Sequence, residues 1–383
     1  MNLADLLGYA DILELSKIAR NYECDCSSNS KNALIQSILS TLGRRDVFEK
    51  QIGGMSIGDL RFLNSLMFDP RNSFSIEELM ARARQTGYTK EEQEACNPRE
   101  TILKFKQRGW IFNGHSPETK HLYRMPDDLK RRFCEVLARQ YRIRLITPGE
   151  PAGYRDERQL IVDDISFFLE AVHHRELLLS ADNGIYKRQL QQILDGMNVR
   201  EEPVRNTPWR FGYGRMFKEY PNRFSLIYDY CYYNGLIEEN GRRLVLTEKG
   251  LAAVTGGEKQ KLSDVYRFWI RLYKGAVPNL QTLVHWVEML AKEWVTVDSL
   301  GEVLCPLIKP YYYDSPQSIF EQRLLQMMMH LGLVRLGEDE RYGKVVQITA
   351  LGSGVIRGTS VAEDDRIALP EQAPGDRWPR AAD

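Results

Sequence analysis

One pattern occurs three times in this chain of 383 residues and restricts what it can fold into. Each copy has a proline, then a stretch of helical length, then a glycine followed by two apolar residues. Proline suits the first helical position because its missing N–H would be unpaired there anyway. Glycine permits the left-handed conformation that ends many helices. The three proline–glycine pairs are Pro98 and Gly109, Pro221 and Gly235, and Pro316 and Gly332.

The residues after each glycine predict a β-hairpin. A polar turn separates two short apolar stretches, and in the second copy this turn contains Asn240-Gly241, a strong hairpin signal. Helix, glycine, strand, turn and strand form the second half of a winged helix. Two shorter amphipathic segments precede each copy and would supply the first half. We therefore expect a mainly α-helical protein with short β-hairpins as wings, built from tandem winged-helix domains.

The repeat also predicts the domain boundaries. Residues 1–45 differ from the repeat and predict a small helical module, in which Ser30 and Lys31 open a second helix. Residues after 357 have no periodicity and contain three prolines, which is typical of a disordered tail. The predicted parts are the module at 1–45, winged helices at 46–147, 158–256 and 257–357, and the tail at 358–383.

Two family resemblances follow from these segments. Residues 163–194, DDISFFLEAVHHRELLLSADNGIYKRQLQQIL, resemble the helicase-associated winged-helix regions that precede the motor of bacterial XPB-type helicases. This resemblance extends over roughly residues 50–357 and implies DNA handling. The chain has no G-x-x-x-x-G-K-[ST] phosphate loop, so the resemblance does not imply ATP hydrolysis by this chain.

The N-terminal module resembles the helix–loop–helix modules of SAP and Rho N-terminal type, which bind nucleic acid. Its charge argues against that role, because residues 1–43 hold three basic and five acidic side chains.

The distribution of basic and acidic residues along the chain indicates where a nucleic-acid surface would lie. The whole chain has 52 basic and 52 acidic residues, so any such surface must be local. Residues 99–144 contain twelve Lys or Arg and five acids, and residues 187–223 contain eight and four. In winged helices the third helix commonly enters the major groove and the wing contacts phosphates. The predicted nucleic-acid-binding residues are Arg99, Lys104, Arg108, Lys120, Arg124, Lys187, Arg188, Arg210, Arg215, Lys218 and Arg223.

The segment WRFGYGRMFKEYPNRF, residues 209–224, combines aromatic and basic side chains. Gly212 and Gly214 allow tight turns there, and Phe224 and Ile227 are predicted core residues. Its other aromatic residues could either pack or face solvent. We expect the aromatic residues to anchor this segment and its cations to form an outward rim, namely Arg210, Arg215, Lys218 and Arg223.

The sequence contains no convincing catalytic site. Ser56 lies in a G-x-S-x-G match, but it also fits S-x-x-D with Asp59, the pattern of a serine that caps a helix. No H-E-x-x-H motif is present, and Cys24 and Cys26 form only a C-x-C pair. We expect no enzymatic activity, no catalytic residues, no cofactor and no metal.

The third copy differs from the others because its helix is apolar. Met327, Met328 and Met329 predict core packing, and a groove for a partner protein is the alternative reading. Tyr311 to Tyr313 form a candidate contact patch that could equally be packed.

Together these features predict a non-enzymatic DNA-binding accessory protein for DNA maintenance, repair or transcription. Its first two winged helices would hold duplex phosphates, and its third would contact a protein such as a helicase subunit. The alternative is a protein-interaction scaffold, an accessory subunit of a helicase or of a chromosome-organising complex. The chain has no membrane-length apolar run and no signal-peptide pattern, so we expect it in the cytoplasm, where association with the nucleoid is one option.

Overall fold

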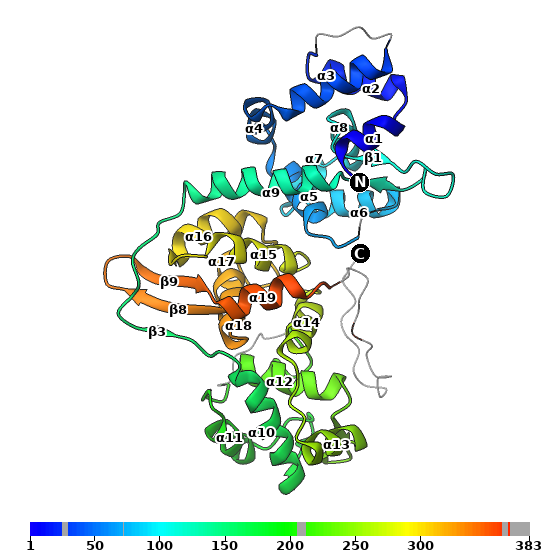
Figure 1. The fold of residues 1–383 in the computed structure, drawn as a ribbon. Helices are drawn as coiled ribbons and strands as arrows, with labels where there is room; N and C mark the ends of the chain where they lie inside the picture. Colours follow the sequence, from blue (N-terminus) through cyan, green and yellow to red (C-terminus); the bar gives the residue numbers. More distant parts are fainter. Residues whose placement is uncertain (25–29, 72, 205–211, 362–366, 368–383) are drawn as a thin grey trace. The chain divides into compact units, whose positions relative to one another are not determined.

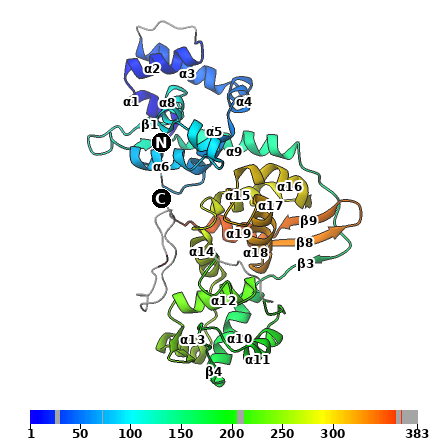
Figure 2. The same cartoon turned by 180° about the vertical axis from the view of Figure 1, so that it is seen from behind.

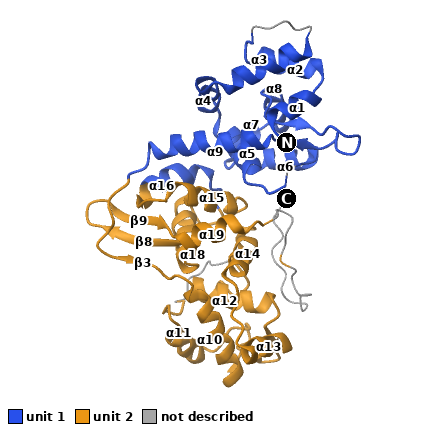
Figure 3. Ribbon diagram, viewed as in Figure 1, with its two compact units in different colours: residues 1–146, 299–310 blue, residues 147–298, 311–383 orange. Residues whose placement is uncertain are grey.

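The structure, a computed structural model, shows a mainly α-helical protein with small antiparallel sheets (Figure 1). This agrees with the predicted fold class at that level. The chain divides into two compact units, coloured separately in Figure 3, with residues 1–146 and 299–310 in unit 1 and residues 147–298 and 311–383 in unit 2. The residues that the structure describes are 1–24, 30–71, 73–204, 212–361 and 367.

Unit 1 begins with the predicted N-terminal module. Ser30 caps its third helix, since the Ser30 hydroxyl accepts a hydrogen bond from the Ala33 N–H at 3.3 Å. The elements of this module are α1 (Leu3–Tyr9), α2 (Ile12–Asn21) and α3 (Lys31–Gly43), and α4 (Arg45–Gly53) follows it.

The rest of unit 1 contains the first copy of the repeat. Ser56 starts α5 as a helix cap, because its hydroxyl accepts from the Asp59 N–H at 3.1 Å. This confirms the capping interpretation of that serine. The elements are α5 (Ile57–Met67), α6 (Ile76–Arg84), α7 (Lys90–Ala95), α8 (Pro98–Gln107), β1 (Phe112–Asn113), β2 (Tyr123–Arg124) and α9 (Asp127–Arg142).

A row of aromatic side chains forms the centre of unit 1. Phe62 on α5 meets Phe105 on α8 edge to face at 4.9 Å between ring centroids, and Phe105 meets Trp110 at 5.1 Å. Trp110 packs on Phe133 of α9 at 4.9 Å, and Phe133 packs on Phe48 of α4 at 4.8 Å. Edge-to-face pairs at these distances are favourable. This row joins α4, α5, α8 and α9 into one core.

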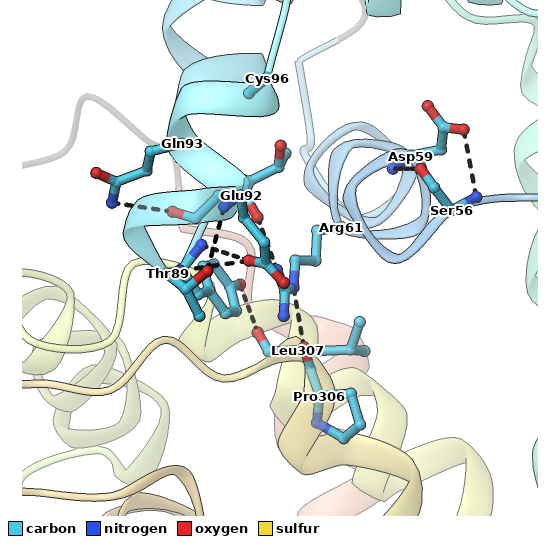
Figure 4. A network of polar contacts seen from close by, with 12 residues as sticks. Ser56, Asp59, Arg61, Thr89, Glu92, Gln93, Cys96, Pro306 and Leu307 are labelled. Carbon is cyan, nitrogen blue, oxygen red and sulfur yellow. Dashed lines mark hydrogen bonds and ion pairs between the residues drawn. The ribbon is translucent and has the colours of Figure 1, made fainter.

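A polar network attaches the segment 299–310 to this unit (Figure 4). Arg61 on α5 donates to the Pro306 carbonyl at 2.9 Å and to Glu92 Oε2 at 2.7 Å. Its guanidinium also lies 3.5 Å from the ring centroid of Tyr88, whose hydroxyl donates to the Leu307 carbonyl at 2.8 Å. Arg61 therefore binds residues that are far apart in the sequence. The segment contains most of α16 (Val297–Leu304) and a 3₁₀ turn (Cys305–Leu307).

Unit 2 contains the second copy and most of the third. The second comprises α10 (Leu160–His174), β4 (Leu177–Leu178), α11 (Lys187–Gly196), α12 (Asn222–Tyr233), β5 (Ile237–Asn240), β6 (Arg243–Leu246) and α13 (Glu248–Gly256). The remaining elements are β3 (Tyr154–Arg155), α14 (Leu262–Tyr273), α15 (Leu280–Leu290), β7 (Val295–Thr296), α17 (Pro316–Ser318), a π-helical segment (Ile319–Leu325), α18 (Gln326–His330), β8 (Val334–Asp339), β9 (Gly343–Ile348) and α19 (Ala350–Gly358).

The three copies share one pattern of strand pairing, and apart from α7, a short extra helix of the first copy, their helices and hairpin strands follow a similar order, with α8 as the third helix of the first copy. A short extended segment between the first two helices pairs antiparallel with the second hairpin strand. The glycine that ends the third helix has a left-handed φ in every copy: +63° at Gly109, +65° at Gly235 and +67° at Gly332. The predicted sequence of helix, glycine and hairpin is thus confirmed. The equivalent strand pairings are Phe74 with Tyr123, Leu177 with Leu244, and Val295 with Val346.

Helix α12 occupies the interior of unit 2. Figures 1 and 2 both show α10, α11 and α13 on one side of it and α14 and α18 on the other. It packs directly against α10, α14 and α18. The helix equivalent to α8 in the second copy is therefore surrounded by other helices.

Candidate nucleic-acid interface

In the first copy, α8 keeps part of its surface open to solvent. Arg99 is exposed, and Leu103, one turn further along, has 51% of its surface exposed. Lys104 is half-buried, and its ammonium group hydrogen bonds to Asp59, the residue that completes the cap of α5. Arg108 lies over the Trp110 ring at 4.7 Å, and burial lowers the pKa of its guanidinium despite the charge of Asp59. Lys104 and Arg108 do share one face, but both interact with neighbouring protein groups.

The wing of the first copy carries the next candidates. Lys120 is exposed in the turn between β1 and β2. Arg124 is half-buried on β2, near the carboxylate of Asp127. Lys106 on α8 attaches the wing to the helix by donating to Asn113 Oδ1 at 2.7 Å. Of the first-copy candidates, Arg99 and Lys120 are thus the exposed cations.

The N-terminal module covers the C-terminal end of α8. The Tyr22 hydroxyl donates to the Arg108 carbonyl at 2.8 Å. Glu14 lies 3.8 Å from Lys106, and burial raises the pKa of this carboxyl group. Ile18 packs so close to Gly109 that a Cβ on that glycine would lie 3.2 Å from Ile18 Cγ2. The acidic module therefore packs directly on the C-terminal end of a basic helix.

In the second copy, the prediction that Arg223 faces outward to bind nucleic acid is wrong. The side chain of Arg223 is 0% exposed. Arg223 Nη2 lies 2.7 Å from Asp164 Oδ2, and Nε lies 3.3 Å from Glu157 Oε2. The reason is the position of α12, whose residues from Arg223 to Cys231 are all buried. Phe224 and Ile227 are core residues, as predicted.

Further polar groups complete this buried cluster. His330 Nδ1 on α18 lies 3.0 Å from Glu157 Oε2. Asp164 Oδ1 accepts from the backbone N–H of Asn198 at 2.8 Å. The sequence contained no signal for the cluster, because its members come from separate segments of the chain.

The glycine-rich segment before α12 is also held by packing. Gly212 and Gly214 have φ of +91° and +128°, as the tight turns require. The Tyr213 ring is buried against Phe217 and Tyr273. This supports the packed alternative for Tyr213, whereas Trp209, Arg210 and Phe211 lie outside the described residues.

The cations of this segment differ in accessibility. Arg215 was expected to face outward. Its guanidinium instead donates two hydrogen bonds to the carboxylate of Glu239 on β5, from Nη2 to Oε2 at 2.7 Å and from Nη1 to Oε1. Its guanidinium also lies 4.5 Å from the ring centroid of Tyr232. Burial beside a bonded carboxylate explains why the prediction was wrong. Lys218 is exposed.

The start of α11 and the second wing bring four exposed cations together. Lys187 and Arg188, two of the predicted nucleic-acid-binding residues, are the first residues of α11, and both are exposed. Arg242 and Arg243, at the turn into β6, are exposed as well, and sequence reasoning missed them. The signal for these two arginines is the wing sequence ENGRR, in which they directly follow the turn residues Asn240-Gly241.

The third copy presents no comparable basic helix. Met327, Met328 and Met329 are buried, which confirms them as core residues. Tyr312 and Tyr313 have 63% and 72% of their surfaces exposed.

Three further observations bear on the kind of protein this is. Within the described ranges, His, Cys, Asp and Glu side chains do not gather in groups that could hold a metal ion. None of the described helices combines the length and apolar character that crossing a bilayer requires. Comparisons of the chain with protein-family models, with curated proteins and with solved structures find no match.

Proposed function

We propose that this chain is a non-enzymatic DNA-binding accessory protein built from tandem winged-helix domains. The observation that carries the proposal is the first copy, where the partly exposed helix α8 is followed directly by a hairpin. Arg99 on that helix and Lys120 on that hairpin are exposed cations at the two places where winged helices commonly meet DNA. Lys187, Arg188 and Lys218 of the second copy are further exposed cations for phosphate contacts.

The shared strand pairing of the three copies supports the winged-helix assignment. In each copy the segment between the first two helices pairs with the second strand of the hairpin, through a single bridge in the first copy and through short strands in the other two. Local clustering of the cations also suits a chain without net charge, because phosphate binding depends on the local field.

A salt titration with a fluorescent blunt duplex tests this proposal. We expect dissociation constants of about 1–100 µM near physiological salt and a linear loss of log affinity with log salt. Reversing the charge of Arg99 and Lys120 together should flatten the slope by about 1.8, since each lost phosphate contact removes about 0.9.

The matched control reverses Lys17 and Lys50, two exposed lysines of α2 and α4, and changes the net charge equally. The slope should then match that of the unmodified chain. Equal slopes for both double variants would reject α8 and its wing as the binding surface.

A protein-interaction scaffold is the second candidate function, and the exposed rings of Tyr312 and Tyr313 favour it. Exposed aromatic side chains are enriched at protein interfaces. The same titration separates the two candidates, because a scaffold without DNA affinity would show no binding to the duplex at low salt.

A further inference from the structure

Three chain segments of the second copy meet at one edge of its sheet. Leu178 on β4 pairs with Arg243 on β6, and the Leu179 N–H donates to the Arg242 carbonyl at 2.9 Å. The Tyr186 N–H, just before α11, donates to the Leu178 carbonyl at 3.2 Å. We name this the β4–β6 surface and define it by Leu178, Tyr186, Lys187, Arg188, Arg242 and Arg243.

The β4–β6 surface combines positive charge with exposed apolar groups. Tyr186 has 48% and Leu178 39% of its surface exposed. Arg243 Nη2 lies 2.8 Å from Glu176 Oε1, but both side chains are largely exposed. Ion pairs between exposed side chains contribute little free energy, so a phosphate can take the place of Glu176.

The burial of helix α12 restricts the form of nucleic acid that the second copy can bind. In a winged helix the third helix would enter the major groove, but α12 is buried from Arg223 to Cys231. The second copy therefore cannot insert this helix into a groove. What it offers instead is four exposed cations and the half-exposed Tyr186 on segments that meet through backbone pairing.

Such a combination matches unpaired nucleotides. Proteins bind single strands with cations along the backbone and with aromatic side chains on which bases stack. In a blunt duplex the bases are already stacked on each other, so the Tyr186 ring has no partner there. Resting on the proposed DNA binding, we propose that the β4–β6 surface binds a single-stranded DNA extension, with Tyr186 as the stacking platform.

Three fluorescent probes test this proposal by anisotropy: oligothymidine, a blunt duplex, and the same duplex with an oligothymidine extension on either strand. The unmodified chain should bind an extended duplex at least about fivefold more tightly than the blunt one, the effect expected of one stacked base. Tyr186→Ala should abolish this advantage and leave blunt-duplex affinity unchanged. Tyr186→Phe should retain it, because the ring remains.

One control variant and one variant of the β4–β6 surface make the result specific. Tyr342→Ala removes another exposed ring, which lies beside Arg341 in the third-copy wing, and should leave all three affinities unchanged. Replacing Arg242 and Arg243 by Ala should flatten the oligothymidine salt slope by about 1.4, about 0.7 for each contact. Circular dichroism melts verify that each variant is folded.

The outcomes separate this inference from the proposed function. If the blunt and extended duplexes bind equally, or if Tyr186→Ala leaves the advantage intact, the β4–β6 surface is not a single-strand site while duplex binding stands. If the unmodified chain binds none of the three probes at low salt, the proposed function fails together with this inference.

Discussion

Arg223 Nη2 lies 2.7 Å from Asp164 Oδ2, and both side chains are completely buried. Asp164 belongs to α10 and Arg223 to α12, so this ion pair joins two helices of unit 2. Glu157 extends it to His330 of α18. A basic residue that the sequence suggested for DNA therefore holds the interior of the fold together.

Removing this arginine should destabilise the protein strongly. In Arg223→Met the carboxylates of Asp164 and Glu157 lose their buried cation, so we expect the free energy of unfolding to fall by about 3–5 kcal/mol. Chemical denaturation followed by circular dichroism measures this loss. Lys218→Met, at an exposed position of the preceding segment, is the control and should stay within about 0.5 kcal/mol of the unmodified chain. Similar small losses in both variants would contradict a structural role for Arg223.

Two equivalent glycines should respond differently to alanine. Gly235 and Gly332 have nearly the same left-handed φ, so alanine costs each about 1–2 kcal/mol of backbone strain. Around Gly235 there is room for a methyl group, whereas a Cβ on Gly332 would lie 1.7 Å from the Arg158 carbonyl oxygen. Gly332→Ala should therefore lower the melting temperature clearly more than Gly235→Ala. Equal shifts would mean that the close approach to Arg158 is not present in solution.

Asp229 should make stability depend on pH. Burial raises the pKa of this carboxyl group to about 7, although its Oδ2 accepts from the Arg215 N–H at 2.9 Å. Between about pH 4 and 7 the unfolded chain is ionised at this position while the folded chain keeps its proton. The free energy of unfolding should fall as pH rises through this window, by about 1.4 kcal/mol for each unit of pKa shift.

Comparing Asp229→Asn with the unmodified chain isolates this effect. Asparagine does not titrate, so the difference in unfolding free energy between the two proteins should change across pH 4–7 and stay level above it. Denaturant titrations at several pH values measure the difference. A difference that is constant from pH 4 to 8 would show that Asp229 titrates normally.

Arg99 and Lys104 lie on the same helix but should behave differently. Lys104→Gln deprives Asp59 of its cation and should lower stability by up to about 1 kcal/mol, with little effect on the salt slope of duplex binding. Arg99→Gln should leave stability unchanged and flatten the slope by about 0.9. Thermal melts and duplex titrations of both variants provide the comparison. The assignment fails if Lys104→Gln flattens the slope as much as Arg99→Gln does.

Local sequence determined the secondary structure of this protein to a large extent. The caps at Ser30 and Ser56 and the left-handed glycines at Gly109, Gly235 and Gly332 all follow from the preferences of single residues. Such preferences depend on a residue and its near neighbours in the chain, so a repeated pattern was enough to predict three helix–hairpin copies.

Only the tertiary structure decided which basic residues face solvent. Arg99 and Arg223 occupy corresponding helices in two copies, yet one is exposed and the other is completely buried. The carboxylates that pair with Arg223, Glu157 and Asp164, come from other segments of the chain. Burial depends on which helices and strands meet across the fold. The identity of a basic residue in the sequence does not tell whether its partner is a buried carboxylate or water.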